Sequence, residues 1–146
     1  MYDRSITLFV SYTDSSREKW WYPYHLEGVD FNSDKAYIFR RYGSDATDNA
    51  VLHVKLENGN IGDYPYVKPK EYAQSENKQQ VITIKGGKDA DVMALGVLAG
   101  YTQAVRDSDY PKGFLQYLTD HYDDVYTVTN VSTPYCLIPH IEVGLK

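Results

Sequence analysis

The sequence contains one cysteine, Cys136, in 146 residues. A single cysteine can form neither an intrachain disulfide nor a cysteine-based zinc cluster. Because Cys136 stands between Tyr135 and Leu137, we interpret it as a small buried hydrophobe rather than a nucleophile.

Long apolar runs are also missing, since none approaches the ~20 residues that a membrane-spanning helix needs. The first residues lack the basic segment, apolar stretch and cleavage site of a secretory signal. These absences predict a cytoplasmic protein without a membrane segment.

Basic side chains are scarce in the C-terminal part of the chain. Residues 1–88 carry 12 acidic and 12 basic side chains, whereas residues 89–146 carry 8 acidic and 3 basic ones. The net charge of −5 therefore arises entirely after residue 88. A protein that binds nucleic acid by neutralising phosphates needs a broad face of Lys and Arg. The charge distribution argues against such a protein and favours a partner with a basic surface.

Phenylalanine is rare and tyrosine abundant, with 4 Phe against 15 Tyr. Tyr and Trp rings are enriched in the hot spots of protein interfaces, because they bring a large contact area with few rotatable bonds. Both tryptophans lie in residues 18–25, EKWWYPYH. In an extended strand, Trp20 and Tyr22 share one face and Trp21 points to the other. Because Glu18 alternates with Trp20, we expect Trp21 to face the core and Trp20 to remain partly exposed.

Apolar and polar residues alternate in several segments, and this pattern predicts that most of the regular structure is strand. Residues 5–12, SITLFVSY, show the clearest period of two. A second strand runs through the aromatic stretch to about residue 29, and Pro23 marks it as an edge or bulged strand. The further expected strands span 35–42, 50–57, 81–85, 125–131 and 136–143, the last of which carries Pro139. The polar, proline-marked residues 64–80 are expected to form a surface connection.

Helical spacing of apolar residues occurs in two places. Val92, Leu95 and Leu98 begin a stripe that predicts a helix over about 89–106. Pro111 suits the first position of a second helix, over about 111–122. The chain is therefore predicted to be a single α+β domain, with a mainly antiparallel sheet of about six strands and both helices packed on one face.

Local motifs for chemistry are few. Gly86 and Gly87 lie between a strand and a predicted helix, but no phosphate-binding loop pattern accompanies them, so we interpret the pair as a turn. The histidines His25, His53, His121 and His140 are far apart and form no local metal-binding motif. A metal site built from them would depend wholly on the fold, and the sequence predicts no cofactor or metal. The acidic group Asp120, Asp123 and Asp124 lies at the end of the second helix. It is either a solvated helix end or a place for a cation or a basic partner.

Residues 6–16, ITLFVSYTDSS, resemble the first strand of ribonuclease H-like nucleases, in which a hydrophobic strand ends in a metal-binding aspartate. In this chain that position is Asp14. The resemblance implies a metal-dependent nuclease. By this resemblance the other metal-site residues are Asp89 or Asp91 and, late in the chain, Asp120 or His121.

Three functional hypotheses follow. The favoured one is a non-catalytic binding or inhibitory module, of the type found in phages and mobile elements, that contacts a protein partner through a Tyr/Trp-rich and partly acidic surface. The residues expected to form this surface are Trp20, Tyr22, Tyr24, Arg40, Arg41, Asp120, Asp123 and Asp124. The second hypothesis is binding of a nucleotide signal or single-stranded nucleic acid, with bases stacked on the aromatic rings and phosphates bound by the two arginines. The third is the metal-dependent nuclease.

Overall fold

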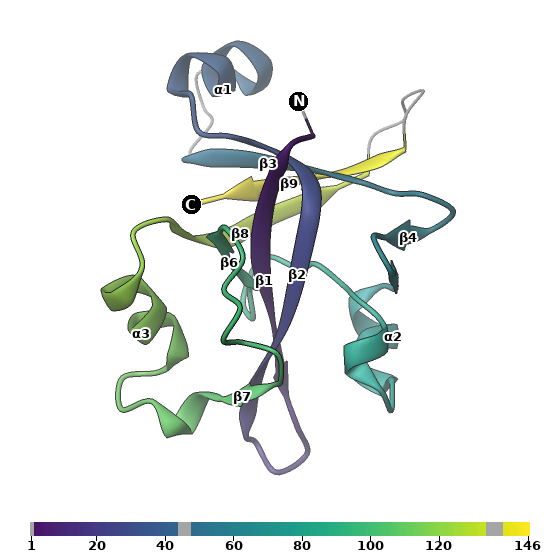
Figure 1. Ribbon diagram of the computed structural model, residues 1–146, viewed down its shortest axis with the longest axis vertical. Helices are drawn as coiled ribbons and strands as arrows, with labels where there is room; N and C mark the ends of the chain where they lie inside the picture. The colour runs from purple at the N-terminus through teal and green to yellow at the C-terminus, as the bar shows by residue number, and fades with distance from the viewer. Residues whose placement is uncertain (1, 44–47, 134–138) are drawn as a thin grey trace.

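Six strands close into an antiparallel barrel in the computed structural model, which describes residues 2–43, 48–133 and 139–146. Around the barrel the order is β1-β6-β8-β9-β3-β2, and pairing of β2 with β1 closes it (Figure 1). The barrel strands are β1 (Arg4–Thr13), β2 (Lys19–Asn32), β3 (Ala50–Lys55), β6 (Val92–Leu95), β8 (Val125–Ser132) and β9 (His140–Leu145). Closure gives each of them two neighbours and so removes the open sheet edges at which other chains could pair.

Shorter elements surround the barrel. They are the strands β4 (Asn60–Ile61), β5 (Tyr64–Pro65) and β7 (Val105–Arg106), the helices α1 (Lys35–Tyr42), α2 (Pro69–Gln74) and α3 (Phe114–His121), and the 3-10 turns η1 (Lys78–Gln80) and η2 (Asp107–Asp109). Figure 1 shows α1 at one end of the molecule, with α2 and α3 on opposite sides. The α+β class and the antiparallel pairing agree with the sequence prediction, whereas the packing of the helices on one face was wrong. No helix in the described part of the chain is long and apolar enough to cross a membrane.

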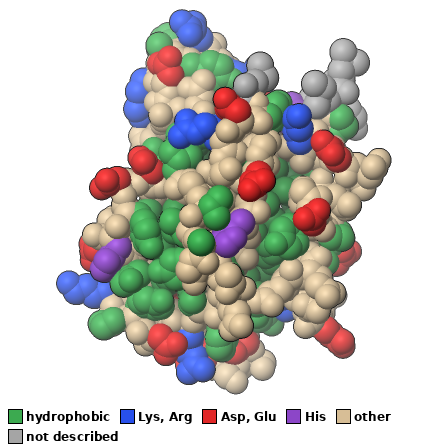
Figure 2. Space-filling view, in the orientation of Figure 1, with side chains coloured by type: hydrophobic (Ala, Val, Ile, Leu, Met, Phe, Trp, Pro, Cys, Tyr) green, Lys and Arg blue, Asp and Glu red, His purple; other side chains and the backbone are tan. Residues whose placement is uncertain are grey.

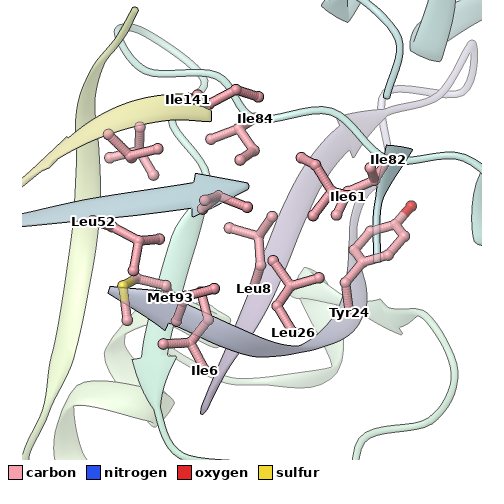
Figure 3. Close-up of a cluster of buried hydrophobic side chains, with 14 of the residues drawn as sticks. Ile6, Leu8, Tyr24, Leu26, Leu52, Ile61, Ile82, Ile84, Met93 and Ile141 are labelled. Carbon is pink, nitrogen blue, oxygen red and sulfur yellow. The ribbon is translucent and has the colours of Figure 1, made fainter. Parts of the chain in front are cut away.

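The barrel interior is filled by side chains from all six strands. On β1, Ile6, Leu8 and Val10 point inward and are at most 1% exposed. Figure 3 shows Ile6 and Leu8 in one cluster with residues of other strands, among them Leu52 and Met93. Because alternate side chains of a strand point to opposite faces, the intervening residues of β1 face outward. This explains why the period of two in residues 5–12 predicted the strand correctly.

A second, smaller core lies outside the barrel wall, beneath α3. Phe9 of β1, Trp21 of β2 and Val92 of β6 project from the barrel and meet Phe114 and Leu118 of the helix. All five are at most 2% exposed. The predicted helix over 111–122 is therefore present, with bounds Phe114–His121. The expectation that Trp21 faces the core is also confirmed.

The predicted helix over 89–106 was wrong. Residues 92–95 form β6, which pairs with β1 on one side and β8 on the other. Gly96 follows with φ of +93°, a conformation that ends the strand and that side chains other than glycine rarely adopt. Because β6 is buried on both faces, its apolar residues do not alternate with polar ones, and the pattern was mistaken for a helical stripe.

Residues 35–42 form helix α1, where the sequence analysis expected a strand. The carboxylate of Asp34 accepts a hydrogen bond from the Ala36 backbone N–H, which caps the helix start. Gly43, with φ of +90°, ends the helix by donating its N–H to the Phe39 carbonyl. Only Ile38 of this helix is buried. The strand assignment failed because the capping residues at both ends outweigh the apolar pattern between them.

The connection over 64–80 is more ordered than predicted. It contains β5, α2 and η1, and Tyr72 of α2 is buried in the barrel core. The Tyr72 hydroxyl lies 2.8 Å from that of Tyr24. Residues 81–85 form no strand, although Ile82 makes a single bridge with Tyr66. Of the predicted strand over 136–143, the structure has β9 from residue 140, and Cys136 lies outside the described residues.

Candidate functional site

The residues predicted to form one binding surface are spread over the molecule. Trp20 lies on the hairpin of β1 and β2, and Arg40 and Arg41 lie on α1 at the opposite end (Figure 1). Tyr24 is 1% exposed and belongs to the barrel core, so it is corrected from a surface residue to a core residue. Tyr22 is half-buried against the same core. The rings and the arginines therefore do not meet on a common face.

Trp20 is held by its neighbours in the hairpin. Its indole Nε1–H donates to Oδ2 of Asp14 at 3.0 Å, and the Arg106 guanidinium lies 5.1 Å from its ring centre. The other Asp14 oxygen accepts the backbone N–H groups of Ser16 and Glu18. Hydrogen bonds, from the Glu18 backbone first and then from Trp20, lower the pKa of Asp14 below its ordinary value of 3.8. Asp14 thus stabilises the hairpin turn.

Asp91 is buried between β1 and the loop that precedes β6. Its Oδ1 accepts the Ser11 backbone N–H and the Lys85 ammonium, and its Oδ2 accepts the Lys85 backbone N–H. Burial raises the pKa of Asp91 to about 6, against the opposing effect of Lys85. Asp120 lies on exposed α3 and accepts a hydrogen bond from Gln116. Among the described residues, the aspartates that the nuclease resemblance implies are thus not assembled into a metal-binding group.

A shallow groove runs along the outer side of α3, and we call it the α3 groove. It is lined by Tyr110, Pro111, Lys112, Gly113, Gln116, Tyr117, Asp120 and His121 and has a volume of about 230 Å³. The Tyr117 ring stacks on His121, with 4.0 Å between their centres, and lies 4.8 Å from Tyr110. Tyr110 in turn packs on buried Phe114 at 4.9 Å. Figure 2 shows hydrophobic side chains gathered over the side of the molecule where α3 lies.

The charges around the α3 groove are mainly acidic. Asp120, Asp123 and Asp124 are exposed at the C-terminal end of α3. Asp109, which directly precedes the groove residue Tyr110 in the sequence, is also exposed. Carboxylates at this end of a helix are unfavourable next to the negative end of its dipole, so they gain from a cation nearby. Lys112 is the basic residue of the lining. The groove combines an aromatic floor with a predominantly negative rim.

A second group of polar residues lies on the outer wall of the barrel near α1. His53 of β3 and the pair His140 and Glu142 of β9 bring ligand-type atoms within 4.8 Å of one another, and we call these three residues the histidine–glutamate cluster. His53 is the cross-strand partner of Glu142 and also of Asp30 on β2. His140 lies two residues before Glu142 on the same face. The barrel register thus assembles residues from three strands.

One carboxylate oxygen, Oε1 of Glu142, lies close to all the other groups of the histidine–glutamate cluster. Oε1 of Glu142 lies 3.6 Å from Nε2 of His53 and 3.4 Å from Nε2 of His140. The same oxygen accepts the Arg41 guanidinium of α1 at 2.8 Å, and Oε2 accepts the Tyr42 hydroxyl at 3.2 Å. The three side chains of the cluster are 11% to 13% exposed. The cluster is therefore nearly closed to solvent.

The ionisation of the cluster follows from burial and from its neighbours. Burial would raise the pKa of Glu142, but hydrogen bonds from Arg41 and His140 outweigh this and lower it. Burial lowers the pKa of His53, so this ring is neutral at neutral pH despite the nearby carboxylates. Nδ1 of His53 faces Oδ2 of Asp30 at 3.6 Å, and its Nε2 is buried without a hydrogen-bond partner.

The histidine–glutamate cluster is not apparent from the sequence, because convergence of the histidines depends on the fold. Arg41, predicted to belong to a partner surface, instead pairs with Glu142. The available signal was the spacing of His140 and Glu142, two residues apart on a predicted strand, which places both side chains on one face. The contribution of His53 depends on the strand register, which the sequence did not reveal.

The whole chain, residues 1–146, matches a family model described as "Family of unknown function (DUF6751)", and the chain belongs to this family. No curated protein and no solved structure matches the chain. Its function is therefore inferred from its own geometry.

Proposed function

We propose that this protein is a non-catalytic binding module that uses the α3 groove to hold a basic segment of a protein partner. The observation that carries the proposal is the stack of Tyr110, Tyr117 and His121 beside exposed Asp120. By occupying a partner's surface, such a module would act as an inhibitor of the phage or mobile-element type.

The size and rigidity of the α3 groove support a protein partner. Its volume of about 230 Å³ is below the roughly 300–1,000 Å³ typical of small-molecule pockets. A groove of this size suits one protruding side chain of a larger partner. Its rings are also fixed in advance, because Tyr110 and Tyr117 pack on Phe114, which is fully buried. Such pre-organisation lowers the entropy that binding costs.

The side chains of the α3 groove favour an arginine as the partner residue that enters it. An arginine side chain can lie flat on an aromatic ring and pair with a carboxylate at the same time. Tyr117 offers the ring and Asp120 the carboxylate, and both line the same groove. Asp123 and Asp124 add negative potential beside it, which speeds the approach of a basic partner.

Stacking of nucleotide bases has less support from the geometry. The hypothesis requires Trp20 beside Arg40 and Arg41, and these residues lie at opposite ends of the molecule. The Trp20 ring is already in contact with Arg106 and hydrogen-bonded to Asp14.

Site-specific photocross-linking in the expressing cell tests the proposal. A benzophenone amino acid at exposed Gln116 should cross-link to one defined protein, whereas the same group at exposed Lys70 on α2 should not. An excess of unlabelled wild-type protein should suppress the cross-link, and an excess of the Tyr117→Ala variant should not. The complex should also weaken at high salt. Equal cross-linking from both positions, or none from Gln116, would rule out the α3 groove as the binding surface.

A further inference from the structure

We propose that the histidine–glutamate cluster is a binding site for a divalent transition-metal ion such as Zn²⁺, coordinated by Nε2 of His53, Nε2 of His140 and Oε1 of Glu142. This site lies on the outer wall of the barrel near α1, apart from the α3 groove. It is independent of the proposed protein-binding function.

The spacing of the three ligand atoms fits one ion. In a tetrahedral zinc site with bonds of about 2.0–2.1 Å, neighbouring ligand atoms are about 3.4 Å apart. Oε1 of Glu142 lies 3.4 Å from the His140 nitrogen and 3.6 Å from the His53 nitrogen. The ion would replace the proton through which Nε2 of His140 hydrogen-bonds to Glu142. All three atoms lie within 4.8 Å of one another. Small side-chain rotations therefore suffice to place an ion at bonding distance from each of them.

The donor set also matches the ion. Imidazole nitrogens with one carboxylate oxygen suit Zn²⁺ and its neighbours in the transition series, whereas Mg²⁺ and Ca²⁺ prefer oxygen alone. Three protein ligands leave a fourth coordination position for water, as is typical of catalytic zinc sites. Because the ligands stand on paired barrel strands, their backbones are held in place before the ion binds.

Residues behind the ligands orient them. Asp30 faces Nδ1 of His53 at 3.6 Å, and a carboxylate behind a histidine ligand holds the ring proton on the nitrogen that is not coordinated. Nε2 of His53 is buried without a hydrogen-bond partner and lies 3.6 Å from Oε1 of Glu142. With the proton on Nδ1, an ion between Nε2 and Oε1 would satisfy this buried nitrogen. The Tyr42 hydroxyl donates to Oε2 of Glu142, the oxygen that the ion would not use.

Arg41 is the natural competitor of the ion. Its guanidinium donates to the same Oε1 of Glu142 that the ion would bind, at 2.8 Å. The Arg41 side chain is 49% exposed and belongs to a short helix, so it can turn into solvent when an ion arrives. Removing its positive charge should therefore strengthen metal binding. A purely structural role of Arg41 predicts no such gain.

The test is a Zn²⁺ titration of tag-free, full-length protein, followed by calorimetry and by competition with a coloured chelator. Wild type should bind one ion per chain. His140→Asn and Glu142→Gln should each weaken binding at least tenfold, while Arg41→Gln should tighten it. His25→Asn, which removes a histidine of β2 that belongs neither to the cluster nor to the α3 groove, is the matched control and should bind like wild type.

Circular dichroism shows whether each variant is folded. If His140→Asn or Glu142→Gln is unfolded, the zinc affinity of Arg41→Gln still tests the proposal. Co²⁺ bound to wild type should give the visible absorption of a four-coordinate site, and Glu142→Gln should lose it. Absence of saturable binding to wild type overturns the proposal. So does wild-type affinity in Glu142→Gln, or weaker binding in a folded Arg41→Gln.

Discussion

The buried carboxylate of Asp91 leads to a prediction about stability and pH. The side chain is fully buried, and burial raises its pKa from an ordinary value of 3.8 to about 6. A carboxyl group whose pKa is higher in the folded state than in the unfolded state binds protons preferentially when folded. Its contribution to stability is therefore complete below about pH 4 and is lost as the pH rises through 6.

The magnitude follows from the two pKa values. Their difference, at 1.36 kcal/mol per pH unit, corresponds to about 3 kcal/mol over the whole range. Between pH 7 and pH 5 the part gained is about 1 kcal/mol. Asp91→Asn has a similar shape and cannot titrate at this position. Wild type should thus gain about 1 kcal/mol of unfolding free energy relative to this variant on going from pH 7 to pH 5.

Urea unfolding of wild type and Asp91→Asn at several pH values between 5 and 7.5 measures this difference. All other titrating groups are shared by the two proteins, so their contributions cancel to a first approximation. If the difference is independent of pH, the pKa of Asp91 is not raised. If wild type instead loses stability relative to the variant on acidification, the ion pair with Lys85 outweighs burial and the reasoning is refuted.

Two further matched pairs test the packing. Trp21→Ala should cost about 3–5 kcal/mol of unfolding free energy, because it empties the core beneath α3, while Trp20→Ala should cost about 1 kcal/mol or less. Equal losses in urea unfolding would contradict the assignment of the two faces. Gly86→Ala should destabilise by about 1–3 kcal/mol, since its new Cβ would lie 2.6 Å from the Thr129 carbonyl oxygen. Gly100→Ala, whose Cβ meets no atom within 4 Å, should leave the midpoint of thermal unfolding nearly unchanged.

The sequence predicted strands best where one face carries polar residues. β8 matches the expected 125–131 within a residue, and β1 extends the expected 5–12 by one residue at each end. The prediction failed at β6, because all four of its residues, 92–95, are apolar and show no alternation. β1 is also buried on both faces, but Thr7 and Ser11 keep its outward face partly polar. At α1, the capping residue Asp34 is the signal for a helix that the sequence offers. Local rules for strands therefore worked only where polar residues alternate with apolar ones.

Barrel closure explains why the candidate sites could be predicted only in part. The interior is packed with side chains, which leaves binding to the outer surface. The α3 groove is made of residues close in sequence, and Asp120 was predicted because it stands in a visible acidic group. The histidine–glutamate cluster instead joins His53 to residues nearly ninety positions away through the pairing of β3 with β9. A shift of one residue in that pairing would turn His53 away from Glu142, so this site exists only as a consequence of the register.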